Sequence, residues 1–214
     1  YLYFIATGFI FSMLALIPKK EQISNEFIIS SIVFNGLGFT SLLAIIVVTY
    51  FSDNYVAIFI SIALFCLLFS IVLKLKSLLK ITASMYILYG FLAMSVAIFG
   101  IYGLPKSYTL FALQSLLVVS MALWFRSRFM VIMNTILFLF FMIFYLKEPE
   151  SSKITDLTFM LVPYVSARVI NWKKERLNIK TEFVRNFYLI SGFIMTLVAF
   201  NHISPASYVT ASWI

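Results

Sequence analysis

Long apolar stretches alternate with short charged segments along the whole chain. A helix crosses the hydrocarbon core of a bilayer with about 20 residues, each rising about 1.5 Å. The apolar stretch that begins at residue 157, the seventh in the chain, approaches that length only if it continues through Arg168 to Trp172. The pattern predicts eight spans, at about residues 1–18, 27–51, 55–73, 81–104, 108–125, 129–146, 157–172 and 184–200, and the start of a ninth at 208.

The apolar stretches indicate helices rather than strands. Backbone in lipid must satisfy its own hydrogen bonds, so a spanning segment is either a helix or part of a closed barrel. Barrel strands alternate in polarity, whereas the run 136–143 (ILFLFFMI) does not. We therefore expect an all-α, polytopic transmembrane helix bundle, with residues 1–214 as a single integral membrane domain.

Composition agrees with this class of protein. Hydrophobic residues make up 63% of the chain and charged residues 11%, against about half and about a quarter in soluble proteins. A soluble domain could not cover its surface with so few charges. The net charge of +8 therefore indicates basic loops that face anionic lipid headgroups, and not nucleic-acid binding.

The basic residues fall almost entirely in every second loop. Twelve of the sixteen lie in the odd-numbered loops, at 19–26, 74–80, 126–128 and 173–186, and three in the even-numbered loops. Short loops rich in Lys and Arg stay on the cytoplasmic side. We expect these four loops to be cytoplasmic, in a multi-pass protein of the plasma (inner) membrane. The alternation also supports the short seventh span, because without it the loop 173–186 would move outside.

Three predicted helix entrances share a pattern. The segments 52–55, 105–108 and 204–208 each place a hydroxyl or amide side chain just before a tyrosine, and 155–157 keeps the capping residues alone. Such side chains cap helix N-termini, and tyrosine suits the depth of the headgroups. Two interpretations remain open: a repeated helical hairpin, or ordinary caps with an aromatic belt.

The predicted spans contain few residues that could carry out catalysis or bind a metal. All eight acidic residues lie in predicted loops or at helix edges, and His202 is the one histidine. No nucleophile–base pair, metal-ligand set or phosphate loop can be assembled from this pattern. We expect no enzyme activity, no cofactor and no metal site. His202 is open to two interpretations, an interfacial loop residue or a catalytic base.

Apart from Arg185 at the very start of the span 184–200, Arg168 is the one charge inside a predicted span. It is either a cation that reaches the cytoplasmic headgroups or one that faces inward and binds an anionic group. Pro163, five residues earlier, is expected to kink the same helix. This span is therefore the first candidate for a functional or lipid-contacting site.

Three uncharged polar residues lie within spans, namely Asn35, Gln114 and Asn134. Each is expected to make an interhelical hydrogen bond, worth about 0.6–2 kcal/mol in membranes, or else to contact a ligand. Small residues such as Ala93 and Ala97 allow neighbouring helices to approach closely.

Several stretches carry a resemblance to known proteins. They are residues 113–117 (LQSLL), 122–128 (ALWFRSR), 167–177 (ARVINWKKERL) and 208–213 (YVTASW). They resemble the large bacterial multi-span membrane proteins of unknown function, in the style of Bacteroidota members. The resemblance implies a polytopic inner-membrane protein longer than this segment, and implies no active-site residue.

These observations favour a non-enzymatic scaffold or assembly domain of a larger membrane protein or complex, with membrane lipids and other membrane subunits as partners. A transporter or flippase for an amphiphilic anionic envelope molecule is the second hypothesis, and a membrane sensor module is the third. A transporter requires a polar path that reaches the bilayer midplane, whereas a scaffold pairs its interior polar residues between packed helices.

Overall fold

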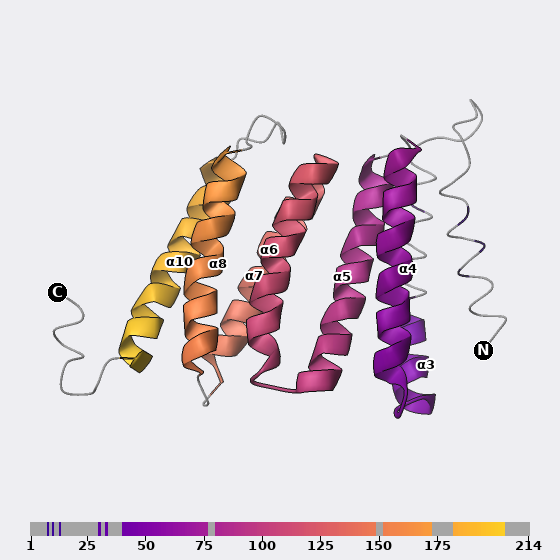
Figure 1. The fold of residues 1–214 in the computed structure, drawn as a ribbon, viewed down its shortest axis with the longest axis horizontal. Helices are drawn as coiled ribbons and strands as arrows, with labels where there is room; N and C mark the ends of the chain where they lie inside the picture. The colour runs from indigo at the N-terminus through magenta and orange to yellow at the C-terminus, as the bar shows by residue number, and fades with distance from the viewer. Residues whose placement is uncertain are drawn as a thin grey trace. The chain divides into compact units, whose positions relative to one another are not determined.

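A computed structural model describes residues 40–76, 80–148, 152–172 and 182–203, with isolated helical positions before residue 40. Within these ranges the chain is all α-helical and forms seven helices (Figure 1). The helices are α3 (Thr40–Tyr50), α4 (Tyr55–Leu75), α5 (Lys80–Tyr102), α6 (Ser107–Phe125), α7 (Arg128–Leu146), α8 (Lys153–Trp172) and α10 (Glu182–Ile203). The chain divides into two compact units, unit 1 (Tyr1–Ile101) and unit 2 (Tyr102–Ile214).

Five helices are long and apolar enough to cross a membrane. They are Tyr55–Leu75, Ile81–Tyr102, Ser107–Phe125, Arg128–Leu146 and Glu182–Ile203. The described residues thus support five of the eight expected spans. The expected span at 1–18 and the start at 208 lie wholly or mostly outside those residues, as does most of the loop 173–186. The expected span at 27–51 is described over its second half, where α3 lies.

Helix α8 has the length of a span but not the composition. It runs for 20 residues, yet it is not among the five apolar helices. Lys153, Asp156 and Arg168 lie within it, together with several hydroxyl side chains. Pro163 is inside the helix, which continues past it to Trp172. The kink expected at Pro163 stays a prediction.

Two helix entrances differ from the expected caps. Helix α6 begins at Ser107, and Lys106 stands at the capping position without a side-chain bond. Ser107 is buried inside the first turn. Asn54 does precede α4, but its side chain makes no capping bond either. The entrance similarity therefore gives no support to a repeated hairpin among the described helices.

The turn between α6 and α7 does contain a side-chain cap, at the start of α7. The Oγ of Ser127 accepts from the backbone N–H of Met130 at 3.4 Å. Arg126 ends α6 in the left-handed conformation, with φ at 52°. Its neighbour Ser127 donates its N–H to the carbonyl of Ala122 at 3.0 Å. These bonds satisfy backbone groups that a helix end leaves free.

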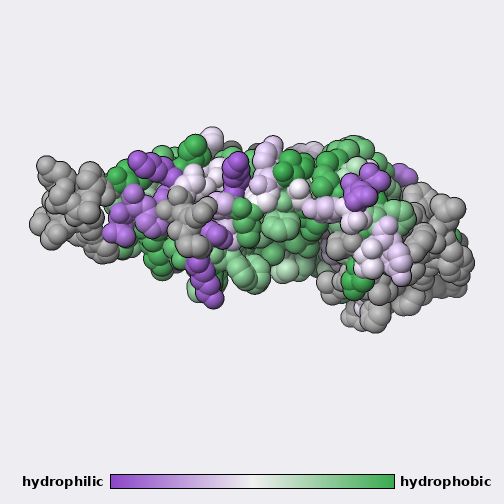
Figure 2. Space-filling model, turned by 90° about the horizontal axis from the view of Figure 1, so that it is seen from below, coloured by the Kyte–Doolittle hydropathy of each residue, from purple (hydrophilic) through white to green (hydrophobic). Residues whose placement is uncertain are grey.

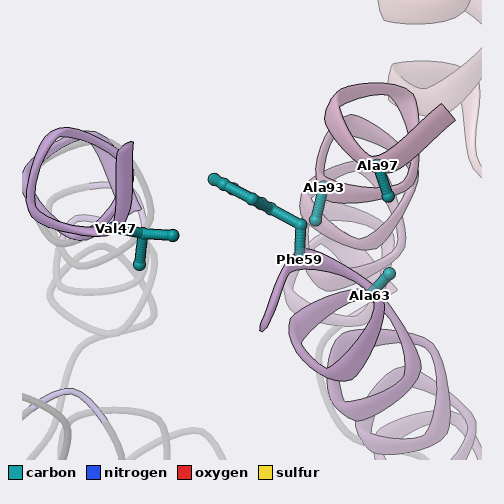
Figure 3. Packing of buried hydrophobic residues seen from close by; sticks show 5 residues of the cluster. All are labelled: Val47, Phe59, Ala63, Ala93 and Ala97. Carbon is teal, nitrogen blue, oxygen red and sulfur yellow. The ribbon is translucent and has the colours of Figure 1, made fainter. Parts of the chain in front are cut away.

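Small residues let α4 and α5 pack closely in unit 1. Ala63 of α4 lies with Ala93 and Ala97 of α5 in a buried apolar cluster, which Phe59 and Val47 complete (Figure 3). The close approach expected from Ala93 and Ala97 is confirmed, since both are buried.

In unit 2, α8 packs against α6 and α10, and α6 packs against α7. Aromatic rings join the helices. The ring of Phe138 on α7 lies 5.7 Å from that of Phe159 on α8 and 5.8 Å from that of Tyr188 on α10. All three rings are buried almost completely. The alternating helix directions bring the start of α6, the end of α7, the start of α8 and the end of α10 to one end of this unit.

Candidate functional site

A buried carboxylate marks that end of unit 2. Asp156 lies in the first turn of α8, and its side chain is 0% exposed. The hydroxyl of Tyr145, near the end of α7, donates to its Oδ1 at 2.8 Å. A buried charge is costly unless it is hydrogen-bonded and paired. Asp156 therefore needs the partners that surround it.

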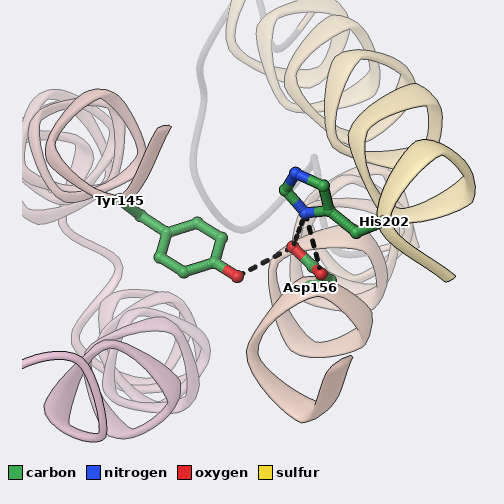
Figure 4. Close-up of polar contacts among 3 residues, drawn as sticks. All are labelled: Tyr145, Asp156 and His202. Carbon is green, nitrogen blue, oxygen red and sulfur yellow. Dashed lines mark hydrogen bonds and ion pairs between the residues drawn. The ribbon is translucent and has the colours of Figure 1, made fainter. Parts of the chain in front are cut away.

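The second partner is His202, in the last turn of α10. Its Nδ1 lies 3.1 Å from Oδ2 and 3.3 Å from Oδ1 of Asp156 (Figure 4). A carboxylate accepts hydrogen bonds, so Nδ1 carries the hydrogen and donates. The side chain of His202 is 37% exposed, so the imidazole joins a buried carboxylate to the surface. We call Tyr145, Asp156 and His202 the Asp156 cluster.

Neighbouring contacts hold the Asp156 cluster in place. The hydroxyl of Thr155 is 2.7 Å from that of Thr109, which ties α8 to α6. The ring of Tyr145 stacks on Phe159 with centroids 5.0 Å apart, and Tyr108 meets it edge-on at 5.4 Å. Four helices thus contribute to this end of the unit. Figure 2, which looks onto this end, shows hydrophilic side chains gathered there beside hydrophobic ones.

The position of Asp156 also suits its charge. The N-terminus of a helix carries a partial positive charge, which favours an anion in the first turn. Asp156 sits in that turn of α8. The helix end and two donors therefore act together on one carboxylate. Among the residues that the structure describes, no three His, Cys, Asp or Glu side chains group as a metal site would require.

A second polar cluster lies in the interior of unit 2. The amide Nδ2 of Asn134 on α7 lies 2.9 Å from the Oγ of Ser115 on α6 and 2.9 Å from the Oη of Tyr188 on α10. It also donates to the carbonyl of Ser115 at 3.2 Å. All three residues are buried. Asn134 therefore makes the interhelical hydrogen bonds expected of it.

Three of the other expected site residues, Gln114, Arg168 and Pro163, lie among the described residues. Gln114 is half-buried on α6, next to Ser115, and Asn35 lies outside the described residues. Arg168 is exposed on α8, and Pro163 is buried on the same helix.

Sequence reasoning missed the Asp156 cluster. His202 was expected in a loop after residue 200, but α10 continues to Ile203 and places it in the last helical turn. Asp156 was expected at a helix edge as a cap, and it is instead a buried acceptor. The predicted alternation of basic and non-basic loops implies that residues 145, 156 and 202 lie at the same membrane face, and this was the signal available in the sequence.

Comparisons with known proteins add no relative: no family model matches the sequence, and neither a curated protein nor a solved structure is similar to it. The several long apolar helices are those of a membrane protein. What this membrane protein does has to be inferred from its own residues.

Proposed function

We propose that this chain is a non-enzymatic membrane domain that scaffolds or assembles a larger membrane protein or complex. One observation carries the proposal. Asn134, the most polar interior residue of α7, uses its amide on Ser115 and Tyr188 of two other helices. An interior amide that binds neighbouring helices stabilises a bundle, whereas a transport pathway needs such groups turned toward a substrate.

The packing of the helices supports the same function. Gly90 on α5 lies so close to α4 that an added Cβ would meet Ala63, Cys66 and Leu67 at 3.1–3.2 Å. Gly192 on α10 lies equally close to the ring of Tyr164 on α8. Close approach through small residues is how membrane helices associate firmly. A rigid bundle of this kind suits a part that holds others in place.

The proposal includes a topology. Eight spans and the start of a ninth cross the inner membrane, with the basic loops on the cytoplasmic side against anionic headgroups. The helix directions in unit 2 support it, because the ends that carry Asp156 and His202 meet on one side. The exposed position of Arg168 on α8 suits contact with those headgroups. The resemblance to large bacterial multi-span proteins extends the proposal to a longer chain with further spans.

Site-specific photo-crosslinking in the native membrane tests the assembly role. The photoreactive residue replaces Ile190 or Phe193 on α10, which are 61% and 60% exposed, or Phe140 on α7, which is 55% exposed. A scaffold forms the same discrete protein adduct from positions on one helix face, such as Ile190 and Phe193. The control is Met195, which is 0% exposed on the same helix and should give no adduct with another protein.

Vesicles provide the opposing test. The purified chain is reconstituted, and the movement of a fluorescent anionic lipid between leaflets is followed. We expect the lipid to move between the leaflets no faster than it does in vesicles without protein. Faster movement, together with lipid adducts alone at all three exposed positions, would replace the scaffold with the transporter or flippase hypothesis.

A further inference from the structure

The Asp156 cluster has a feature that a purely structural bond would not need. A tyrosine hydroxyl alone can satisfy a buried carboxylate oxygen, yet the second oxygen is paired with a histidine. Histidine is the side chain that gains and loses a proton between about pH 5 and 8. The imidazole is also 37% exposed, so protons can reach it from the surface.

We propose that His202 and Asp156 form a proton-binding site that sets how firmly the ends of α7, α8 and α10 are held together. The ligand is the proton itself. The inference goes beyond the scaffold function and does not depend on it, because it concerns only the bonds within unit 2.

The sign of the effect follows from the charges. With a neutral imidazole, the carboxylate of Asp156, in a side chain that is 0% exposed, has hydrogen-bond donors but no positively charged side chain as a partner within the Asp156 cluster. When His202 takes up a proton, the pair becomes neutral overall and the Nδ1–H bond becomes a charge-assisted one. The added attraction is therefore present at acid pH and is lost as pH rises through the range in which histidine gives up its proton.

Other ionisable residues also belong to this end of unit 2. Tyr145 belongs to the Asp156 cluster and Tyr108 on α6 contacts its ring, and the described charged residues at the adjoining helix ends are Lys106, Lys147, Glu148 and Lys153. Ordinary carboxylates ionise near pH 4, and lysine and tyrosine near pH 10. His202 is the one histidine of the chain. A transition near neutral pH that disappears when His202 is replaced therefore belongs to this site.

The experiment measures thermal unfolding of the full chain in detergent between about pH 5.5 and about pH 8. Tryptophan fluorescence reports on unit 2, because Trp124, Trp172 and Trp213 all lie in its range. We expect the Tm to fall by about 2–4 °C as pH rises across this range. His202→Gln keeps a side-chain donor without a titrating proton, so its Tm should be independent of pH and close to the wild-type value at the alkaline limit.

Two further variants separate this site from other causes. Asp156→Asn keeps the size of the acceptor and removes its charge, so it should lower the Tm and abolish the pH dependence. Tyr145→Phe removes a donor but leaves the pair, so it should lower the Tm and keep the slope. A wild-type slope in His202→Gln or Asp156→Asn, or a wild-type Tm that does not change with pH, would overturn the proposal.

Discussion

Asn134 and Tyr188 are 54 residues apart in the chain and share a 2.9 Å hydrogen bond in the interior of unit 2. Tyr188 is fully buried, and its ring packs against Phe138, one turn beyond Asn134 on α7. The polar and aromatic contacts therefore fix the same pair of helices, α7 and α10. Because lipid offers no competing hydrogen bonds, a polar contact of this kind sets which faces of two helices meet.

A double-mutant cycle should measure this bond. Asn134→Ala and Tyr188→Phe each remove one partner, and each should destabilise the fold by about 1 kcal/mol or somewhat more. Their coupling should be about 0.6–1.7 kcal/mol, the range found for hydrogen bonds between membrane helices. Reversible unfolding by a denaturing detergent, followed by tryptophan fluorescence, provides the measurement. Strictly additive effects would mean that the two side chains do not interact.

The sequence predicts the helices well because their signal is local. Apolar length alone places α4, α6 and α7 within two residues of their observed bounds. The capping residue of α6 was predicted wrongly, because Ser107 lies inside the first turn and not before it. Which side chain caps a helix depends on the conformation of the preceding loop, and apolar length carries no information about that.

The site could not be predicted in the same way. His202 and Asp156 are 46 residues apart and on different helices, so their contact depends on the rotation of α8 and α10 about their axes. That rotation follows from packing, for instance of Gly192 against Tyr164, which a single sequence does not show. The alternation of basic loops predicts that the two residues lie at the same membrane face, but only the structure shows that they are in contact.

The bond from Tyr145 to Asp156 should matter more than a similar bond at the surface. Tyr145→Phe leaves one oxygen of a buried carboxylate without its 2.8 Å donor, and should cost about 1.5–3 kcal/mol of unfolding free energy. The matched control is Tyr164→Phe, which removes the exposed 3.2 Å contact with Thr196 and should change stability by less than about 0.5 kcal/mol. Equal losses in the two variants would argue against a special role for burial at Asp156.

A larger side chain between α4 and α5 should lower the stability of unit 1, because the two helices pack closely. Ala97 is 1% exposed within the unit 1 cluster, so Ala97→Leu should destabilise unit 1 by about 1–3 kcal/mol through overpacking. Ala57→Leu makes the same chemical change at an exposed position of α4 and serves as the control. Cys66 is the single cysteine and is buried. Its reaction with a thiol-specific fluorescent dye during heating reports the unfolding of unit 1. If Ala97→Leu and Ala57→Leu unfolded at the same temperature, Ala97 would not lie in a close contact between α4 and α5.

The proposed orientation rests on twelve basic residues in the odd-numbered loops against three in the even-numbered ones. Lys106 and Lys76 are exposed at the connections after α5 and α4, and should therefore lie on opposite sides of the membrane. In a Cys66→Ala background, Lys106→Cys should react with an impermeant maleimide added to intact cells. Lys76→Cys should react only after the membrane is permeabilised. The reverse pattern would invert the topology, and labelling of both positions from outside would mean that α5 does not span the bilayer.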